Sequence, residues 1–135
     1  MIEDILRGKS ILVTDDDPRN TYALSCYLDA MGIGMKVLTA LNGRDAVRLL
    51  DAYDDIDIVL MDIMMPDIDG YECIRQIRTS NGTSSKVPII AVTAKAMKGD
   101  KEKCLEAGAS GYVSKPVDMD ELLRTMAGVL NPLKA

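Results

Sequence analysis

The chain alternates five times between a short apolar run and a segment with helical periodicity, and this alternation limits the folds open to it. The apolar runs are rich in Ile and Val, which is typical of strands covered on both faces. They occupy residues 10–14, 35–40, 56–61, 87–92 and 111–114. Parallel neighbouring strands need a crossover connection, normally a right-handed one through a helix. We therefore expect an α/β fold with a doubly wound, five-stranded parallel sheet and helices on both faces.

Two of these strands are expected nearer the edges of the sheet, because 35–40 is mixed in polarity and 111–114 is short. The helices are bounded by capping signals. Asp17 with Pro18, Asn42 and Asp118 predict three helix starts, since their side chains can accept bonds from the first free N–H groups. The remaining two helices are expected before the turn at 80–82, and over about 97–107 with a stop at the following glycine.

Three cysteines, Cys26, Cys73 and Cys104, lie far apart inside the helical patterns. We expect buried thiols in a reducing compartment, with a redox pair as the alternative.

The first residues contain no apolar core of a signal peptide, and no apolar run approaches the ~18 residues of a membrane span. These features predict a cytoplasmic protein without membrane insertion. Its 135 residues suit about one domain, over residues 1–135 with a core at about 10–130.

The composition excludes several classes of chemistry. The chain has no histidine, which removes catalytic triads with a histidine base and metal sites built on imidazole. Sixteen basic residues against 21 acidic ones give a net charge of -5. Because no basic stretch stands out, we expect no direct binding to nucleic acid.

Polar residues follow four of the predicted strands: Asp15 to Asp17 the first, Asp62 the third, Thr93 the fourth and Lys115 the fifth. In an open parallel sheet these carboxyl ends meet at one edge, where ligands bind. Each residue alone also has an ordinary interpretation, as a helix cap, a turn residue or a surface charge. Their convergence on one edge favours a functional site. Neighbouring carboxylates repel each other unless a cation is present, and an oxygen-only cluster suits Mg²⁺.

The sequence resembles a response-regulator receiver domain over about residues 10–130. The motifs that carry the resemblance are Leu12-Val13-Thr14-Asp15-Asp16-Asp17-Pro18, Leu60-Met61-Asp62-Ile63-Met64-Met65-Pro66-Asp67-Ile68-Asp69-Gly70, Ala91-Val92-Thr93-Ala94 and Gly111-Tyr112-Val113-Ser114-Lys115-Pro116. Residues 94–100 and 104–109 are similar to receivers attached to hybrid histidine kinases. The resemblance implies a flavodoxin-like sheet with strand order 2-1-3-4-5.

The resemblance also implies the chemistry. Asp62 matches the aspartate that accepts a phosphoryl group from the phosphohistidine of a histidine kinase or histidine phosphotransfer protein. The implied Mg²⁺ ligands, with Mn²⁺ as a possible substitute, are Asp16, Asp62 and the backbone carbonyl of Met64, with Asp15 acting through water. The protein would then be a phosphoacceptor that assists its own phosphorylation and dephosphorylation, and not an enzyme that turns over a separate substrate.

Further residues would bind the phosphoryl group, and one of them would change position once the group is bound. Lys115, Thr93 and Ala94 match the phosphoryl-binding positions. Tyr112 matches an aromatic that turns inward, although an ordinary strand aromatic is the alternative. This movement would alter a partner-binding face made by the fourth helix, fifth strand and fifth helix. The Lys115–Pro116 bond matches a cis peptide of the family.

Two positions are expected to set the lifetime of the phosphoryl group. Met64 and Lys95 lie two residues after Asp62 and Thr93, and in the family these positions flank the path of the attacking water. Met64 cannot hold a water by hydrogen bonds, whereas Lys95 can shield the phosphoryl oxygens or point to solvent.

Three other functions fit parts of the sequence. A haloacid-dehalogenase-like, Mg²⁺-dependent phosphohydrolase would use Asp15 as its nucleophile, but that class has an acidic pair after a later strand, where this chain has Thr93-Ala94-Lys95. A flavodoxin-like FMN binder shares the sheet, but the acidic residues at 15–17 would repel its phosphate. An interaction module that works without phosphorylation is disfavoured, because all the acceptor-site residues are present.

Overall fold

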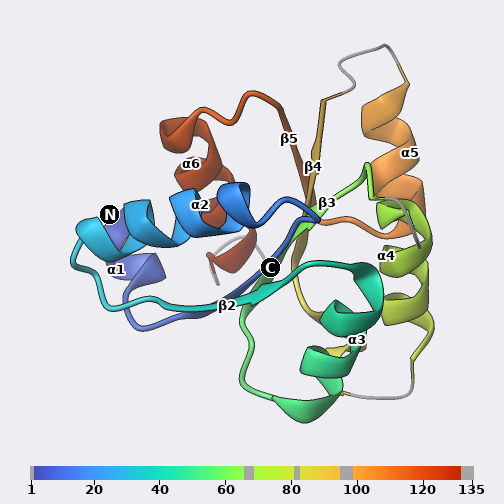
Figure 1. The fold of residues 1–135 in the computed structure, drawn as a ribbon, viewed down its shortest axis with the longest axis horizontal. Coiled ribbons are helices and arrows are strands. Elements are labelled where there is room, and N and C mark those ends of the chain that lie inside the picture. Colours follow the sequence, from blue (N-terminus) through green and yellow to red (C-terminus); the bar gives the residue numbers. More distant parts are fainter. Residues whose placement is uncertain (1, 66–68, 81–82, 95–98, 132–135) are drawn as a thin grey trace.

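The computed structural model describes residues 2–65, 69–80, 83–94 and 99–131 (Figure 1). Strands and helices alternate along these residues as expected. The strands are β1 (Ser10–Thr14), β2 (Lys36–Ala40), β3 (Ile58–Asp62), β4 (Ile89–Thr93) and β5 (Gly111–Ser114). The helices are α1 (Ile2–Leu6), α2 (Pro18–Ala30), α3 (Gly43–Ala52), α4 (Gly70–Thr79), the 3₁₀ helix η1 (Thr83–Lys86), α5 (Asp100–Ala107) and α6 (Met119–Leu130).

The strands form one parallel sheet in the order β2-β1-β3-β4-β5, which confirms the predicted fold class and strand order. Every residue of β1, β3 and β4 is buried, whereas β2 and β5 are partly exposed. The continuous apolar runs therefore mark the centre of the sheet, and the two less apolar runs lie at its edges.

Two hydrophobic layers cover the sheet, one on each face. Helices α3, α4 and α5 lie on one side in Figure 1, and α1, α2 and α6 lie on the other. Alternate residues of β1 divide between the layers, since Leu12 packs in the first and Ile11 and Val13 in the second. This division is what a doubly wound sheet requires.

The capping predictions are also confirmed. Asp17, Asn42 and Asp118 cap α2, α3 and α6, and each accepts a bond from a backbone N–H of the first turn. Strands β3 and β4 begin later than predicted, at Ile58 and Ile89, although the preceding apolar residues are also buried. The helix predicted over about 97–107 is α5, which is described from Asp100 onward, and residues 97–98 lie outside the described residues.

Further features also differ from the sequence expectations. The prediction that all three cysteines are buried is wrong for Cys26, which is exposed, whereas Cys73 and Cys104 are buried and all three are free thiols. Helix α1 was not expected, because five residues are too few to show helical periodicity. It is anchored by Leu6, which is fully buried in the same layer as α6.

Within the described residues, no helix combines the length and the apolar character needed to cross a membrane.

Candidate functional site

The parallel register brings the ends of β1 and β3 to the same level of the sheet. Thr14 pairs with Met61, so that Asp15 and Asp62 follow side by side. Thr93 pairs with Ser114 between β4 and β5, and the Lys115 N–H donates to the Thr93 carbonyl at 2.8 Å. The predicted site residues at the carboxyl ends of four strands therefore lie at one edge of the sheet.

Three carboxylates form a cluster at this edge. Asp15, Asp16 and Asp62 each offer an oxygen, and these oxygens all lie within 4.8 Å of one another. Asp15 and Asp62 are buried, with exposed fractions of 7% and 3%, whereas Asp16 is exposed. Two buried negative charges and one at the surface thus face a common point.

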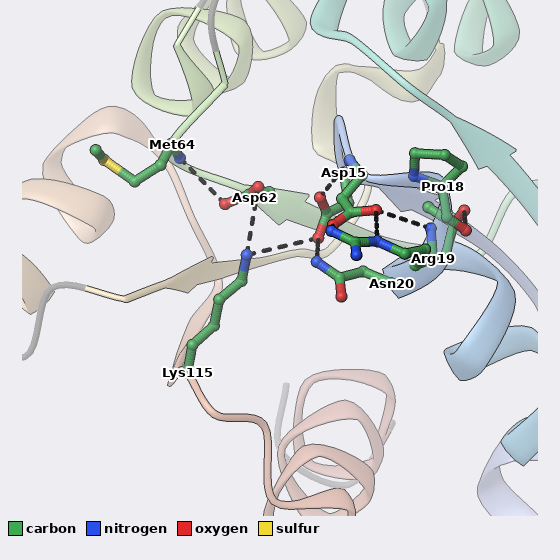
Figure 2. Close-up of polar contacts among 9 residues, drawn as sticks. Asp15, Pro18, Arg19, Asn20, Asp62, Met64 and Lys115 are labelled. Carbon is green, nitrogen blue, oxygen red and sulfur yellow. Dashed lines mark hydrogen bonds and ion pairs between the residues drawn. The ribbon is translucent and has the colours of Figure 1, made fainter.

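The ammonium group of Lys115 bridges the two buried carboxylates (Figure 2). Its Nζ lies 3.5 Å from an Asp15 oxygen and 3.4 Å from an Asp62 oxygen. Lys115 follows the short edge strand β5 and crosses above the ends of the central strands to reach them. One positive charge against three negative ones leaves this group of four side chains with an excess of negative charge.

Asp15 is held in place by two further donors. Asn20 Nδ2 donates to Asp15 Oδ2 at 3.1 Å, and the Asp17 N–H donates to Asp15 Oδ1 at 2.9 Å. Sequence reasoning missed Asn20, which lies in the first turn of α2. Its only sequence signal is an amide within one helical turn of the acidic run, where a solvated side chain is equally expected.

Burial is the main influence on the Asp62 carboxylate, and it raises the pKa of this group. The negative charge of Asp15 acts in the same direction. The Met64 N–H, which donates to Asp62 Oδ1 at 3.1 Å, and the Lys115 ammonium oppose the shift and lower the pKa. The net direction is upward, so the carboxylate of Asp62 is poorly compensated in the protein alone.

Asp17 has a different role from its two acidic neighbours. Its carboxylate caps α2 through the Arg19 N–H at 2.9 Å and forms an ion pair with the Arg19 side chain at 2.8 Å. The hydrogen bond to Arg19 lowers the pKa of Asp17. Asp17 is therefore a structural residue at the rim of the site.

The loop after Asp62 is closed by Gly70 at the start of α4. The Gly70 N–H donates to the Ile63 carbonyl at 2.9 Å. A Cβ atom at position 70 would lie 2.5 Å from the Ile63 Cα and 2.6 Å from the Asp62 carbonyl oxygen. Only glycine allows α4 to approach this closely, and the approach fixes the backbone that carries Asp62.

The other predicted residues that the structure describes lie on β4 and β5 or shortly after these strands. Thr93 is fully buried at the end of β4, and Ala94 beside it is exposed. Tyr112 is half-buried against the layer of α3, α4 and α5, and burial raises its pKa. The Lys115–Pro116 bond is cis. Lys95 lies outside the described residues.

The donor set fits a hard divalent cation. The three clustered groups offer only oxygen, and their mutual repulsion is reduced when a cation lies between them. At ~4 Å two such charges repel by about 4 kcal/mol at an effective dielectric constant of about 20. The Met64 carbonyl as a further ligand stays a prediction.

Comparison with known proteins gives one consistent family. The family model described as the response regulator receiver domain matches residues 11–127. Protein PilH of Pseudomonas aeruginosa is 41% identical over 120 residues, which cover 89% of this chain and 96% of PilH. The sensor histidine kinase RcsC of Salmonella typhi is 42% identical over 117 residues, which cover 87% of this chain and 12% of RcsC.

The solved structures agree with the sequence relatives. The receiver domain of a sensor histidine kinase from Pseudomonas aeruginosa PAO1, crystallised with a magnesium ion coordinated in its active-site cleft, superimposes with a TM-score of 0.79. It is 36% identical, and the match covers 91% of this chain and 98% of that one. The chain therefore spans nearly the whole of PilH and of this receiver domain, but only a small part of the histidine kinases that it matches.

Proposed function

Because the chain belongs to the response-regulator receiver domain family, we propose that it is a phosphorylation-dependent switch of two-component signalling. In this proposal Asp62 accepts a phosphoryl group from the phosphohistidine of a histidine kinase or a histidine phosphotransfer protein. The kinases among its relatives support this class of partner.

One observation carries the assignment of Asp62. Its carboxylate is 3% exposed, ends the central strand β3, and lies 3.4 Å from Lys115 Nζ beside two further carboxylates. A buried, poorly compensated carboxylate in reach of a cation is the arrangement that an oxygen nucleophile for phosphoryl transfer needs.

We propose Mg²⁺ as the cofactor, held by Asp16, Asp62 and the Met64 carbonyl, with Asp15 acting through water. The oxygen-only cluster supports this choice, as does the magnesium ion in the related receiver domain. When bound, the ion would supply positive charge to the phosphoryl oxygens and offset the repulsion between them and the carboxylates.

In the proposed reaction an Asp62 oxygen attacks phosphorus, the bond from phosphorus to the donor imidazole nitrogen breaks, and its electron pair stays on that nitrogen. Lys115 is placed to leave its bridging position and contact a phosphoryl oxygen. Thr93 and the backbone of Ala94 would bind the other oxygens. Most of the catalysis then comes from positioning and charge, which are the main contributions in phosphoryl transfer.

The output of the switch would be a change in the face formed by α5, β5 and α6. Tyr112 lies on β5 within this face and is half-buried, so it has room to become more deeply buried. We propose that residues 1–135 are one receiver domain with its core at about 10–130. The free, buried thiols of Cys73 and Cys104 agree with a reducing compartment such as the cytoplasm.

Receiver domains are signalling domains, and we propose that this chain does not turn over a separate substrate. The alternative, a phosphohydrolase that uses Asp15 as nucleophile, is not favoured by the family match. In the structure Asp15 already accepts bonds from Asn20 and the Asp17 N–H, which leaves it less available for attack than Asp62.

The test is the intact mass of the protein after incubation with Mg²⁺ and acetyl phosphate. We expect one phosphoryl group on the wild type, dependence on Mg²⁺, and no uptake by Asp62→Asn, because an amide is a poor nucleophile of nearly the same volume. Uptake by the folded Asp62→Asn variant at the wild-type rate would reject the proposal.

A further inference from the structure

Asn20 lies in the first turn of α2, within reach of the carboxylate cluster (Figure 2). It is the third residue of a helix whose N-cap is Asp17 and whose first residue is Pro18. Side chains of a helix tilt toward its N-terminus, so a side chain at this position points back to the residues that precede the helix. The Asn20 amide donates there to Asp15 Oδ2 at 3.1 Å. The start of α2 thus places an uncharged donor against one oxygen of the site.

The same oxygen is also contacted by the ammonium group of Lys115. Lys115 Nζ lies 3.5 Å from Asp15 Oδ2 and 3.4 Å from Asp62 Oδ2. Among the described residues, Asn20 and Lys115 are the two whose side chains contact Asp15 Oδ2. The Asp17 N–H donates to the other oxygen, Oδ1, at 2.9 Å. Asp15 Oδ2 is therefore shared between a cation on a long, flexible side chain and an amide on a short one.

The two donors differ in what happens to them in the proposed reaction. Lys115 moves from Asp15 to a phosphoryl oxygen, and Asp15 then loses a donor while its side chain remains largely buried, with an exposed fraction of 7% for the residue. A buried carboxylate oxygen without a donor is unfavourable. Asn20 stays at Asp15, because its short side chain is held by the first turn of α2. The amide can therefore lower the cost of moving Lys115.

We propose that Asn20 is a positioning residue that keeps Asp15 in place after Lys115 has moved to the phosphoryl group. Asn20 acts through Asp15 and does not itself contact the phosphoryl group. The inference rests on the proposed function of Asp62 and adds a residue to it. Without the Asn20 amide, Lys115 becomes the main partner of Asp15 Oδ2, and its transfer to a phosphoryl oxygen becomes less favourable.

The experiment uses beryllofluoride, a stable mimic of the phosphoryl group. Titration calorimetry on the full chain gives the Kd of Mg²⁺ alone and the Kd of beryllofluoride in saturating Mg²⁺. In Asn20→Ala, Lys115 still holds Asp15 when Mg²⁺ binds alone, so the Kd of Mg²⁺ should stay close to that of the wild type. Beryllofluoride draws Lys115 away from Asp15, so its Kd should rise. Because Asn20 is itself exposed and water replaces part of its bond, we expect a rise of about fivefold, the size of one net hydrogen bond.

Asn20→Leu separates the loss of the donor from a loss of structure. Leucine has nearly the shape of asparagine, carries no donor and no charge, and favours a helix more strongly. This variant should be at least as stable as the wild type in EDTA and should still bind beryllofluoride about fivefold more weakly. A role of Asn20 in stability alone predicts no such separation. Asn20→Leu also keeps the test decisive if Asn20→Ala fails to fold.

Arg19→Ala is the matched control. Arg19 lies in the same turn of α2, is exposed, and forms its ion pair with Asp17 instead of Asp15. Both Kd values of this variant should stay close to those of the wild type.

Equal affinity for beryllofluoride in the wild type, Asn20→Ala and Asn20→Leu would overturn the proposal. Equal losses of affinity for Mg²⁺ and for beryllofluoride would also overturn it, because Asn20 would then act before Lys115 moves. A wild-type protein that binds no beryllofluoride in Mg²⁺ would instead refute the proposed function of Asp62, on which the inference rests.

Discussion

Replacement of Gly70 by alanine tests how the backbone that carries Asp62 is held in place. A Cβ at this position would lie 2.5 Å from the Ile63 Cα, 2.6 Å from the Asp62 carbonyl oxygen and 2.8 Å from the Ile63 Cδ1. The first of these distances must widen to at least 3.4 Å for an ordinary contact. Two of the three obstructing atoms belong to the backbone and cannot rotate away, so either α4 or the end of β3 must move.

The magnitude follows from the cost of overpacking, which is typically about 1–3 kcal/mol. Because the obstruction is backbone, we expect the upper end, a loss of about 3 kcal/mol in the free energy of unfolding. Gly128→Ala is the matched control, since it adds the same methyl group inside α6 where nothing lies within 4 Å. That variant should gain about 0.5–1 kcal/mol, because glycine weakens a helix interior.

The assay is urea unfolding followed by circular dichroism in EDTA. With a slope of about 1–3 kcal/mol per molar urea, the loss in Gly70→Ala corresponds to a midpoint lower by about 1 M or more. Phosphoryl uptake by the variant should also slow, since Asp62 shifts with its backbone. A Gly70→Ala protein as stable as the wild type, or a Gly128→Ala protein destabilised to the same extent, would refute this reasoning.

Three further predictions concern the charges and the lifetime of the site. In EDTA, burial raises the pKa of Asp62 above its ordinary value of 3.8, so the native state binds more protons than the unfolded chain as the pH rises above that value. The free energy of unfolding contributed by Asp62 therefore falls as the pH increases. Asp62→Asn should have a higher melting temperature than the wild type at pH 7 and a melting temperature that depends less on pH. A lower melting temperature than the wild type would contradict this. Mg²⁺ at about 100 times its Kd should stabilise the wild type by about 2.7 kcal/mol. Asp16→Ala should lose most of this stabilisation by Mg²⁺, although the variant should be more stable than the wild type without metal. An unchanged Mg²⁺ response in Asp16→Ala would remove Asp16 from the ligand set. Met64→Asn and Lys95→Glu should each speed loss of the phosphoryl group in Mg²⁺ buffer without preventing uptake, because they allow a water to be held near phosphorus; decay curves that overlay the wild type would show that neither position sets the lifetime.

The centre of the fold could be predicted because burial on both faces leaves a direct mark on the sequence. The strands at 10–14, 58–62 and 89–93 are continuous apolar runs, and the alternation with helices restricts how they connect. The convergence of Asp15, Asp62 and Lys115 followed from the same argument, since Asp62 is the last residue of β3 and the other two come directly after strands of the same parallel sheet.

Other features depend on how helices are placed in three dimensions. Cys26 is exposed because it lies two residues after Leu24, about 200° around the helix from the apolar stripe. Arg78 donates to the carbonyl oxygens of Ser85, Val87 and Gly108 at 2.9, 2.6 and 2.8 Å. No local sequence pattern predicts such bonds, because their acceptors are backbone groups in segments that meet only after folding.

The contact between Asn20 and Asp15 belongs to the same class. An amide in a first helical turn is expected in solvent as often as in a site, and only the placement of α2 over the end of β1 decides between them.

The position of the phosphoryl group is the central claim, and chemical mapping tests it most directly. Borohydride reduces an aspartyl phosphate to homoserine but leaves a free carboxylate unchanged, so peptide mass spectrometry of the reduced protein identifies the acceptor. We predict homoserine at position 62 alone, after incubation with Mg²⁺ and acetyl phosphate. Homoserine at position 15 or 16, with Asp62 unchanged, would contradict the account.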